Sequence, residues 1–451
     1  MSAVPAQDVG LPALRRMFEG VVPAALCTVC EDGAPHICFV SQVEYLDDRH
    51  VALSYQFLNR SRRNVLATRR AALSVCDPYT AASVTLQLEY LRSETSGPLF
   101  ERMRAKLAGI ASHSGMEKVF RLQGADVYRV LDLTRVPGRR ELEAPAPRCD
   151  LAQALRAVCD DIAACGDAGE LLDRTLAGLQ AHLRIDHAMV LMLDQRTQRL
   201  VTVASRGYAT SGLGSEIPLG HGVAGIAARE GVPIRIGHLT MSQAYARAAR
   251  HRTEALGLGA VAEAEIPLPG ITDPRSQMAV PLRLLGRVQG VLLVESRFDQ
   301  HFSYDDEDAL TVLAGQLALA LNLVQKQEVD DAPAPPAPSR PAGEAVLVRH
   351  HAGEDAVFLD NAYLIKGVAG AIFRKLVADH LADGRLDFSN RELRLDPSLK
   401  LPDVADNLEV RLLLLQRRLD ERQAPVRLEK TGRGRFRLRL ERPLRLETVR
   451  G

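Results

Sequence analysis

The sequence predicts a multidomain protein: a small antiparallel β-barrel, then an α+β domain, then a second and smaller α+β domain. Its 451 residues are about three times the usual length of one domain. Segment 330–343 reads DDAPAPPAPSRPAG, and five prolines among fourteen residues are typical of an extended, semi-rigid linker. A weaker boundary of proline and charge falls at 136–150. We therefore predict domains at 1–140, 150–329 and 344–451, with the linker at 330–343 before the last.

Composition is that of an ordinary globular protein, with 46% hydrophobic and 25% charged residues. The formal net charge is only +1, so any attraction to nucleic acid must come from a local cluster of charge. No apolar stretch approaches the length of a membrane span, and the first ten residues, MSAVPAQDVG, lack the pattern of a signal peptide. We expect a cytoplasmic protein that does not enter a membrane.

All seven cysteines fall within the first 165 residues. An odd number without a signal peptide argues against a disulfide framework. Cys27 and Cys30 form a C-x-x-C, which allows either a redox or metal role or plain core thiols. The surrounding AALCTVC is typical of a strand, where residues three apart point to opposite faces. Core packing is favoured, and no metal site is expected.

The first domain is predicted mainly as short strands, AALCTVC, HICFVSQVEYL, HVALSYQF and AALSVCD, followed by a helix near 98–111 and the strand ADVYRVLDLTRV. The stretch SYQFLNRSRRNVLATRRAALSVCDP combines a strand, a turn with hydroxyl and guanidinium groups, and a helix. This domain resembles the pyridoxamine-phosphate-oxidase-like split barrels, which bind FMN across a dimer interface. The resemblance implies that Ser61, Arg62 and Arg63 hold a phosphate, with Tyr55 and Asn59 near the ring or the ribityl chain.

Two alternatives remain open for that site. The paired arginines could simply open a surface helix, and related barrels handle haem, for which His36 and His113 are conceivable ligands. The R-x-V-L-L-K stretch of the true oxidases is replaced here by HICFVSQVEYL, which lacks both basic residues. We therefore expect no oxidase catalysis and assign no catalytic residue; FMN is the favoured cofactor and haem the weaker one.

The second domain is carried by three pieces: EIPLGHGVAGIAAREGVPIRI, MAVPLRLLGRVQGVLLVES and FSYDDEDALTVLAGQLALAL. Gly220, Gly222 and Gly225 match a dinucleotide fingerprint, but no βαβ unit surrounds them, so we interpret them as a tight approach into a short helix. The segment resembles GAF domains. That resemblance implies a small-molecule pocket beneath the middle of the domain, where His238 and Tyr245 are the candidate ligand contacts. The last helix, from Tyr304, could pack on its own sheet or pair with a second copy.

The third domain contains a capping box, Ser389-Asn390-Arg391-Glu392, and then the helix DNLEVRLLLLQRRLDER and the hairpin VRLEKTGRGRFRLRL. Leucines at 408, 412, 415 and 419 form a core stripe. The segment resembles an OmpR-like winged helix. From residue 411 to the end there are 13 lysines and arginines against five acidic residues, which favours contact with DNA phosphates. The predicted DNA-binding residues are Asn407, Arg411, Arg418, Arg422, Arg433 and Arg435.

Together these features predict a one-component transcriptional regulator, dimeric, that senses a flavin, redox or small-molecule signal and binds DNA through its last domain. Two alternatives remain. The protein could be a flavin- or haem-dependent oxidoreductase with two regulatory domains. It could also be a signalling scaffold in which Leu413 and Leu414 bind another protein, because exposed leucines suit a protein interface better than a DNA groove.

Overall fold

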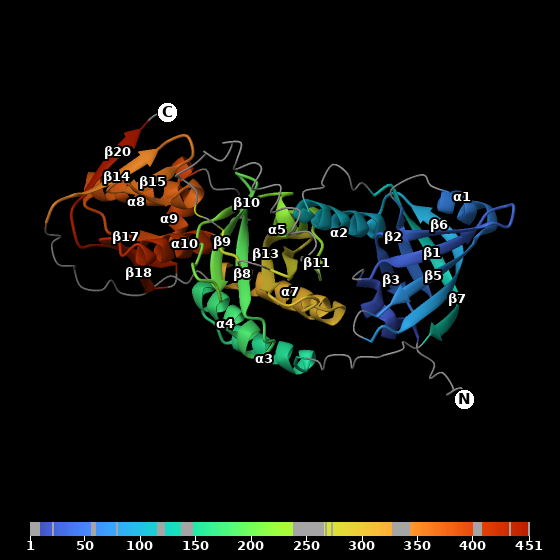
Figure 1. Cartoon of the computed structure of the whole chain (residues 1–451). Helices are drawn as coiled ribbons and strands as arrows, with labels where there is room; N and C mark the ends of the chain where they lie inside the picture. The colour runs from blue at the N-terminus through green and yellow to red at the C-terminus, as the bar shows by residue number, and fades with distance from the viewer. Residues whose placement is uncertain are drawn as a thin grey trace.

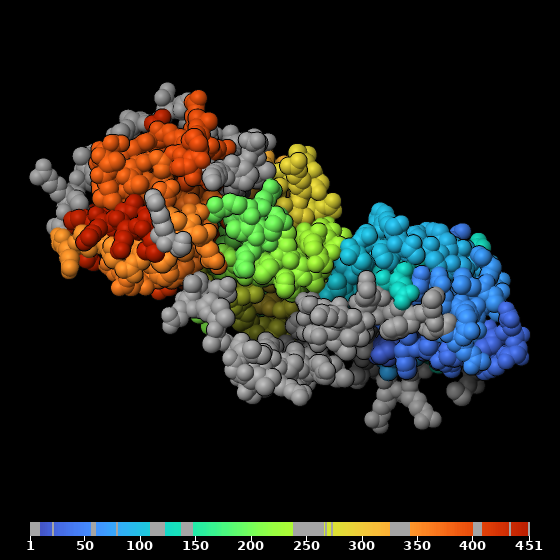
Figure 2. Space-filling model, turned by 90° about the horizontal axis from the view of Figure 1, so that it is seen from above, coloured from blue at the N-terminus to red at the C-terminus, as the bar shows by residue number. Residues whose placement is uncertain are grey.

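A computed structural model describes residues 10–19, 22–55, 60–77, 80–114, 122–136, 148–237, 266, 268–271, 274–326, 343–399, 408–432 and 434–449. Three bodies lie in a row, with the N-terminal domain at one end and the C-terminal domain at the other (Figure 1). The space-filling view shows the same order, with the central domain touching both neighbours (Figure 2). The central domain therefore lies between the other two.

The N-terminal domain is built on a seven-stranded antiparallel sheet in the order β2-β1-β5-β6-β7-β4-β3. Alternate side chains of its strands are buried, as in β5, where Leu73 and Val75 enter the core. The predicted strands are present, and the long strand β6 was missed. The elements are η1 (Leu11–Glu19), β1 (Ala24–Val29), β2 (Pro35–Val40), β3 (Val43–Asp47), β4 (His50–Tyr55), α1 (Arg60–Thr68), β5 (Arg70–Cys76), β6 (Ser83–Glu94), α2 (Pro98–Ser114) and β7 (Gly124–Val136).

The central domain has a six-stranded sheet in the order β10-β9-β8-β13-β12-β11. Helices α3, α4 and α7 share a core with one face of the sheet, and α5 packs on the other face. The elements are α3 (Leu151–Ala163), α4 (Ala168–Ala181), β8 (His187–Asp194), β9 (Arg199–Arg206), β10 (Glu216–Pro218), α5 (Gly222–Glu230), β11 (Ile234–Ile236), β12 (Ser276–Leu284), β13 (Arg287–Ser296) and α7 (Tyr304–Lys326).

The glycine motif opens α5 as predicted. Gly220 has a φ of +82°, and a Cβ atom on Gly225 would lie 2.4 Å from the carbonyl oxygen of Pro218. A side chain at either position would strain or block the turn into the helix. The motif is thus a packing feature of this domain.

Helix α7 packs on its own sheet through Leu310, Leu313 and Leu317, which are fully buried. In the described part of the chain it is the one helix long and apolar enough to cross a membrane. Its buried leucines belong to the core of the central domain. Its outer side exposes Val312, Leu319 and Leu323.

The C-terminal domain combines two small sheets, in the orders β16-β15-β14-β20 and β17-β19-β18, with three α-helices. The predicted capping box is present: Ser389 accepts a bond from Glu392 N, and the Glu392 carboxylate accepts one from Ser389 N. The elements are β14 (Val346–His351), β15 (Ala356–Leu359), β16 (Ala362–Ile365), α8 (Gly367–Asp383), β17 (Asp387–Ser389), α9 (Asn390–Leu395), η2 (Pro397–Leu399), α10 (Leu408–Glu421), β18 (Val426–Gly432), β19 (Arg435–Leu440) and β20 (Leu444–Val449).

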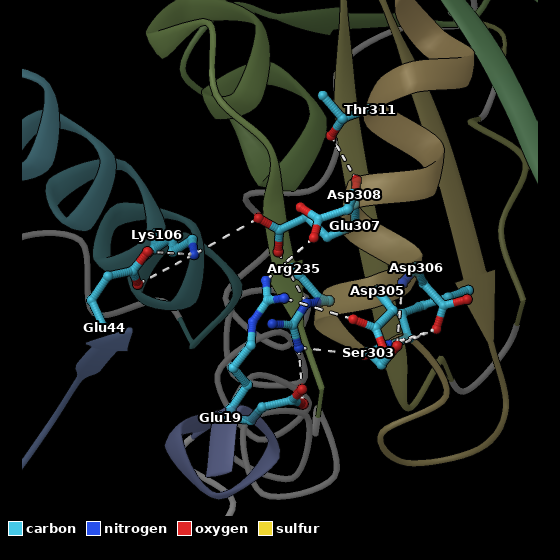
Figure 3. A network of polar contacts seen from close by, with 12 residues as sticks. Glu19, Glu44, Lys106, Arg235, Ser303, Asp305, Asp306, Glu307, Asp308 and Thr311 are labelled. Atoms are coloured by element: carbon cyan, nitrogen blue, oxygen red, sulfur yellow. Dashed lines mark hydrogen bonds and ion pairs between the residues drawn. The ribbon is translucent and has the colours of Figure 1, made fainter. Parts of the chain in front are cut away.

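A buried ionic network joins the N-terminal and central domains (Figure 3). Arg235 of β11 pairs with Glu19 of η1 at 2.9 Å and with Glu307 of α7 at 3.0 Å. Lys106 of α2 bonds Glu44 of β3 at 3.1 Å and lies 3.9 Å from Glu307. Burial opposes ionisation of Glu307, yet Lys106 and Arg235 hold its pKa below the ordinary value. Arg235 and Lys106 therefore each interact with carboxylates of both domains.

Replacing Arg235 with methionine should destabilise the protein by about 3–5 kcal/mol, because Glu19 and Glu307 would be left buried without their cation. Urea unfolding of the full chain measures this. The matched control is Arg275→Met: Arg275 is half-exposed and lies 3.7 Å from Asp299, so its loss should cost less than about 1 kcal/mol. Equal effects of the two changes would contradict the assignment of Arg235.

Candidate functional site

The predicted phosphate residues of the N-terminal domain lie at the start of α1, beside β4. Ser61 is buried and its hydroxyl donates to the Cys38 thiol at 3.0 Å. Arg63 is exposed, and Asn59 lies outside the described residues. Tyr55 ends β4, and its ring lies against Gly124, where a Cβ atom would come within 2.3 Å of it. The structure thus brings Tyr55, Ser61 and Arg62 to one pocket wall.

Arg62 in this pocket is already engaged by the protein. Its guanidinium lies 4.1 Å from the centre of the Tyr55 ring, donates to Ser93 Oγ at 3.2 Å, and places Nε 3.7 Å from Asp126 Oδ2. Asp126 is buried, and this burial raises its pKa. Arg62 therefore faces a protein carboxyl group, not solvent.

The arrangement does not fit an FMN phosphate. The pocket between β1, β2, β4 and α1 has a volume of about 160 Å³ on a single copy of the chain, and the Asp126 carboxyl group lines it beside Arg62. Ser61 donates to Cys38 and Arg62 donates to Ser93 within the domain, and Arg63 does not line this pocket. As placed, these residues form no common phosphate site, and we derive no step through a flavin.

The thiols and histidines of this domain form no metal centre among the described residues. Cys30 accepts hydrogen bonds from Arg60 Nε at 3.2 Å and Asn64 Nδ2 at 3.3 Å, so α1 is held to β1 partly through sulfur. His36 is half-buried on β2, and the side chain of His113 lies outside the described residues.

In the central domain, His238 and Tyr245 lie outside the described residues, but another polar cluster occupies the α5 face of the sheet. Glu295 of β13 and Gln277 of β12 are bonded at 2.5 Å, and Tyr208 lies beside them. Glu295 follows Leu293 by two residues, so both side chains point to the same face. Glu295 Oε2 and the Tyr208 hydroxyl are buried and close enough to interact with each other, and within the described residues neither makes a hydrogen bond of good geometry.

Such a pair of buried polar atoms at the end of an apolar sheet face is a candidate ligand contact. Burial raises the pKa values of both Glu295 and Tyr208. Sequence reasoning missed this pair, because neither residue belongs to a motif; the break in the apolar run LLVES at Glu295 was the one available signal.

In the C-terminal domain, the predicted DNA-binding residues are divided between exposed and buried positions. Arg422 and Arg435 are exposed, whereas Arg411 and Arg418 are each only 4% exposed. Asn407 and Arg433 lie outside the described residues. The face that was predicted to meet a DNA groove is therefore largely covered in this arrangement.

The cover for Arg411 is the central domain. Its Nη2 lies 3.6 Å from Asp194 Oδ2 and 3.4 Å from the carbonyl oxygen of Leu193. Arg418 instead bonds the carbonyl oxygen of Leu364 at 3.1 Å within its own domain. The two leucines proposed for a protein scaffold are also occupied: Leu414 is buried in the C-terminal core and Leu413 packs on the central domain.

A family model described as GAF domain matches residues 165–322, and the central domain is a GAF domain. Such a domain implies a sensory or regulatory role. No curated protein matches the chain.

Solved structures give partial matches. The GAF domain of an Acinetobacter phosphoenolpyruvate-protein phosphotransferase is 23% identical and covers 40% of this chain and 97% of that one, with a TM-score of 0.31. A free methionine-R-sulfoxide reductase from Neisseria meningitidis is 23% identical, covers 40% and 92%, and has a TM-score of 0.30. An FMN-binding protein from Syntrophomonas wolfei is 17% identical, covers 28% and 86%, and has a TM-score of 0.24.

Glu295→Gln should make the protein more stable at about pH 8 and have little effect at about pH 4. Because the folded pKa of Glu295 is raised, ionisation opposes folding at pH values above that pKa, and the cost disappears below the unfolded value near 4.3. A gain on the order of 1 kcal/mol is expected. Thermal unfolding at both pH values measures it; Glu354→Gln, at an exposed position, is the control and should show no such difference.

Proposed function

We propose that the protein is a one-component sensory regulator, in which a small-molecule effector of the GAF domain controls DNA binding by the C-terminal domain. The observation that carries this proposal is the position of the GAF domain, which contacts the N-terminal domain through Arg235 and the C-terminal domain through α10. A ligand that alters the GAF domain can therefore act on both neighbours directly.

The effector would bind on the α5 face of the GAF sheet, at Glu295 and Tyr208. A buried carboxyl group suits a ligand that donates hydrogen bonds, such as an amine or an amide. His238 and Tyr245, which lie outside the described residues, remain proposed contacts.

The DNA-directed output is supported by the order of elements in the C-terminal domain. Three helices, α8, α9 and α10, precede the two-stranded hairpin β18–β19, which is the order of a winged helix. Arg422 follows α10 and Arg435 opens β19, and both are exposed. Such an output would place the protein in the cytoplasm.

A homodimer is part of the proposal. The exposed residues Val312, Leu319 and Leu323 of α7 are separated by seven and four positions, a spacing that forms a stripe along one side of a helix. Ile37 and Phe39 of the edge strand β2 are also exposed, at 66% and 76%. Either surface would bury apolar area against a second copy.

The double variant Arg422→Ala/Arg435→Ala should bind a mixed-sequence DNA duplex about tenfold more weakly in low salt, with a salt slope reduced by about 2. Fluorescence anisotropy over a series of salt concentrations measures both quantities. The control removes the same charge from the GAF hairpin, at the exposed residues Arg283 and Arg287, and should leave binding unchanged. If the control weakens binding as much, the C-terminal domain is not the DNA reader.

For the N-terminal domain, we propose that Asp126 beside Arg62 weakens binding of FMN in this pocket. We expect the purified protein to show no flavin band, and Asp126→Asn to strengthen binding of added FMN about tenfold, because Arg62 would lose its carboxylate partner. Quenching of flavin fluorescence measures the affinity. Asp132→Asn, at an exposed position of β7, is the control; a flavin band in the wild-type protein would contradict the prediction.

A further inference from the structure

Helix α10 is enclosed by two domains along almost its whole length. Between Leu408 and Glu421 only Asp420 and Glu421 are exposed. Its own domain buries Leu408, Leu414, Leu415 and Leu419 in one core.

The GAF domain covers another side of the helix. Val410 is 1% exposed and belongs to the GAF core, and Leu413 packs against that core. In return, Val201 and Leu213 of the GAF domain belong to the core of the C-terminal domain. The two cores therefore interlock at α10, and we call this contact the α10 interface.

Arginines of α10 fix this interface by bonding the GAF main chain. Arg417 donates to the carbonyl oxygens of Val203 at 3.0 Å and Gly169 at 3.4 Å, and to Asp173 Oδ1 at 2.7 Å. Arg411 adds the bonds to Leu193 and Asp194 described above. The guanidinium groups of Arg411 and Arg417 are thus bonded to the GAF domain and cannot contact DNA phosphates at the same time.

Polar pairs of the two domains surround the α10 interface. Lys366 lies 3.4 Å from Glu216, Arg196 lies 3.1 Å from Asp355, and Lys430 lies 3.6 Å from Asp167. Pairs that are partly exposed contribute little each, about 0–1 kcal/mol, so this rim orients the domains without locking them.

A helix that reads DNA needs far more free space than α10 has. With its side chains a helix is about 10–12 Å wide, and it nearly fills a major groove of about 12 Å. Along α10 a cleft of about 810 Å³ remains between α4 and the β18–β19 hairpin. DNA cannot enclose α10 while the GAF domain is in place.

We propose that the α10 interface is an autoinhibitory contact: the GAF domain holds α10 away from DNA, and separation of the two domains exposes it. This inference rests on the proposed function and adds the direction of control, since the closed form is the inactive one. The linker 330–343 keeps the separated domain close, so re-closure is intramolecular.

The same strand connects the effector face with the α10 interface. The carbonyl oxygen of Val203, which accepts a bond from Arg417, lies in β9, and Tyr208 follows two residues after the end of that strand. A ligand that moves Tyr208 and bends the end of β9 would alter the acceptor of Arg417. An effector needs only a difference in affinity between the closed and open forms to shift their populations.

The test opens the α10 interface from the GAF side, leaving α10 unchanged. A Cβ atom on Gly169 would lie 3.1 Å from Leu413 Cδ1, so Gly169→Trp should force α10 away. Gly166→Trp is the matched control, because a Cβ atom there meets nothing within 4 Å. Asp173→Lys, which reverses the charge facing Arg417, is the second opening variant; Asp160→Lys, on an exposed side of α3, is its control.

Two quantities are measured on each full-length variant: hydrogen exchange of residues 408–421 and affinity for a mixed-sequence DNA duplex at one salt concentration. The proposal expects faster exchange and about tenfold tighter DNA binding in both opening variants, with both controls like the wild type. Unchanged exchange in both opening variants overturns the proposal. So does faster exchange with DNA binding no tighter than in the controls.

The outcomes also separate this inference from the proposed function. If the wild type already binds DNA as tightly as the opened variants, the autoinhibitory contact is wrong and the DNA-directed function stands. If no variant binds DNA although exchange of α10 is faster, the proposed function is wrong and the inhibitory role falls with it.

Discussion

A buried guanidinium group is stable only when carboxylates or carbonyl oxygens accept its hydrogen bonds. In this chain the buried guanidinium of Arg235 has acceptors from two domains, and their relative position depends on it. Its two partners come from different domains, Glu19 from η1 and Glu307 from α7. The pairing fixes the N-terminal domain against the start of the longest helix of the GAF domain. Burial raises the pKa of Glu19 even though Arg235 lies beside it.

On the opposite side of the GAF domain, arginines of α10 again bond to the domain, and there their acceptors include backbone carbonyl oxygens. Arg411 and Arg417 take backbone carbonyl oxygens of Leu193 and Val203, each supplemented by one aspartate. Asp194 beside Arg411 is buried, whereas Asp173 beside Arg417 is exposed. The GAF domain is thus held on one side by ion pairs around Arg235 and on the other mainly by bonds from arginines to its main chain.

The sequence predicted local features well and contacts between distant segments poorly. The strand β8, the capping box at Ser389 and the β18–β19 hairpin were recovered because each is encoded by neighbouring residues. Arg411 and Leu414 were predicted to be exposed on α10, and both are buried. The helix packs against two domains, so two of its sides face a core, whereas the leucine periodicity in the sequence indicates only one of them. Glu295 was missed because its polar neighbours, Gln277 of β12 and Tyr208, are distant in the sequence and meet it only in the folded sheet.

Val410 has a consequence for how the chain is made. This residue of the last domain fills part of the GAF core, although it lies 84 positions after the end of α7 at Lys326. During synthesis the GAF domain leaves the ribosome first and must wait with that apolar site open to water. Until α10 has been synthesised and has docked, the nascent protein exposes an apolar surface that a chaperone can bind. Docking of α10 is therefore also the step that covers this apolar part of the GAF core.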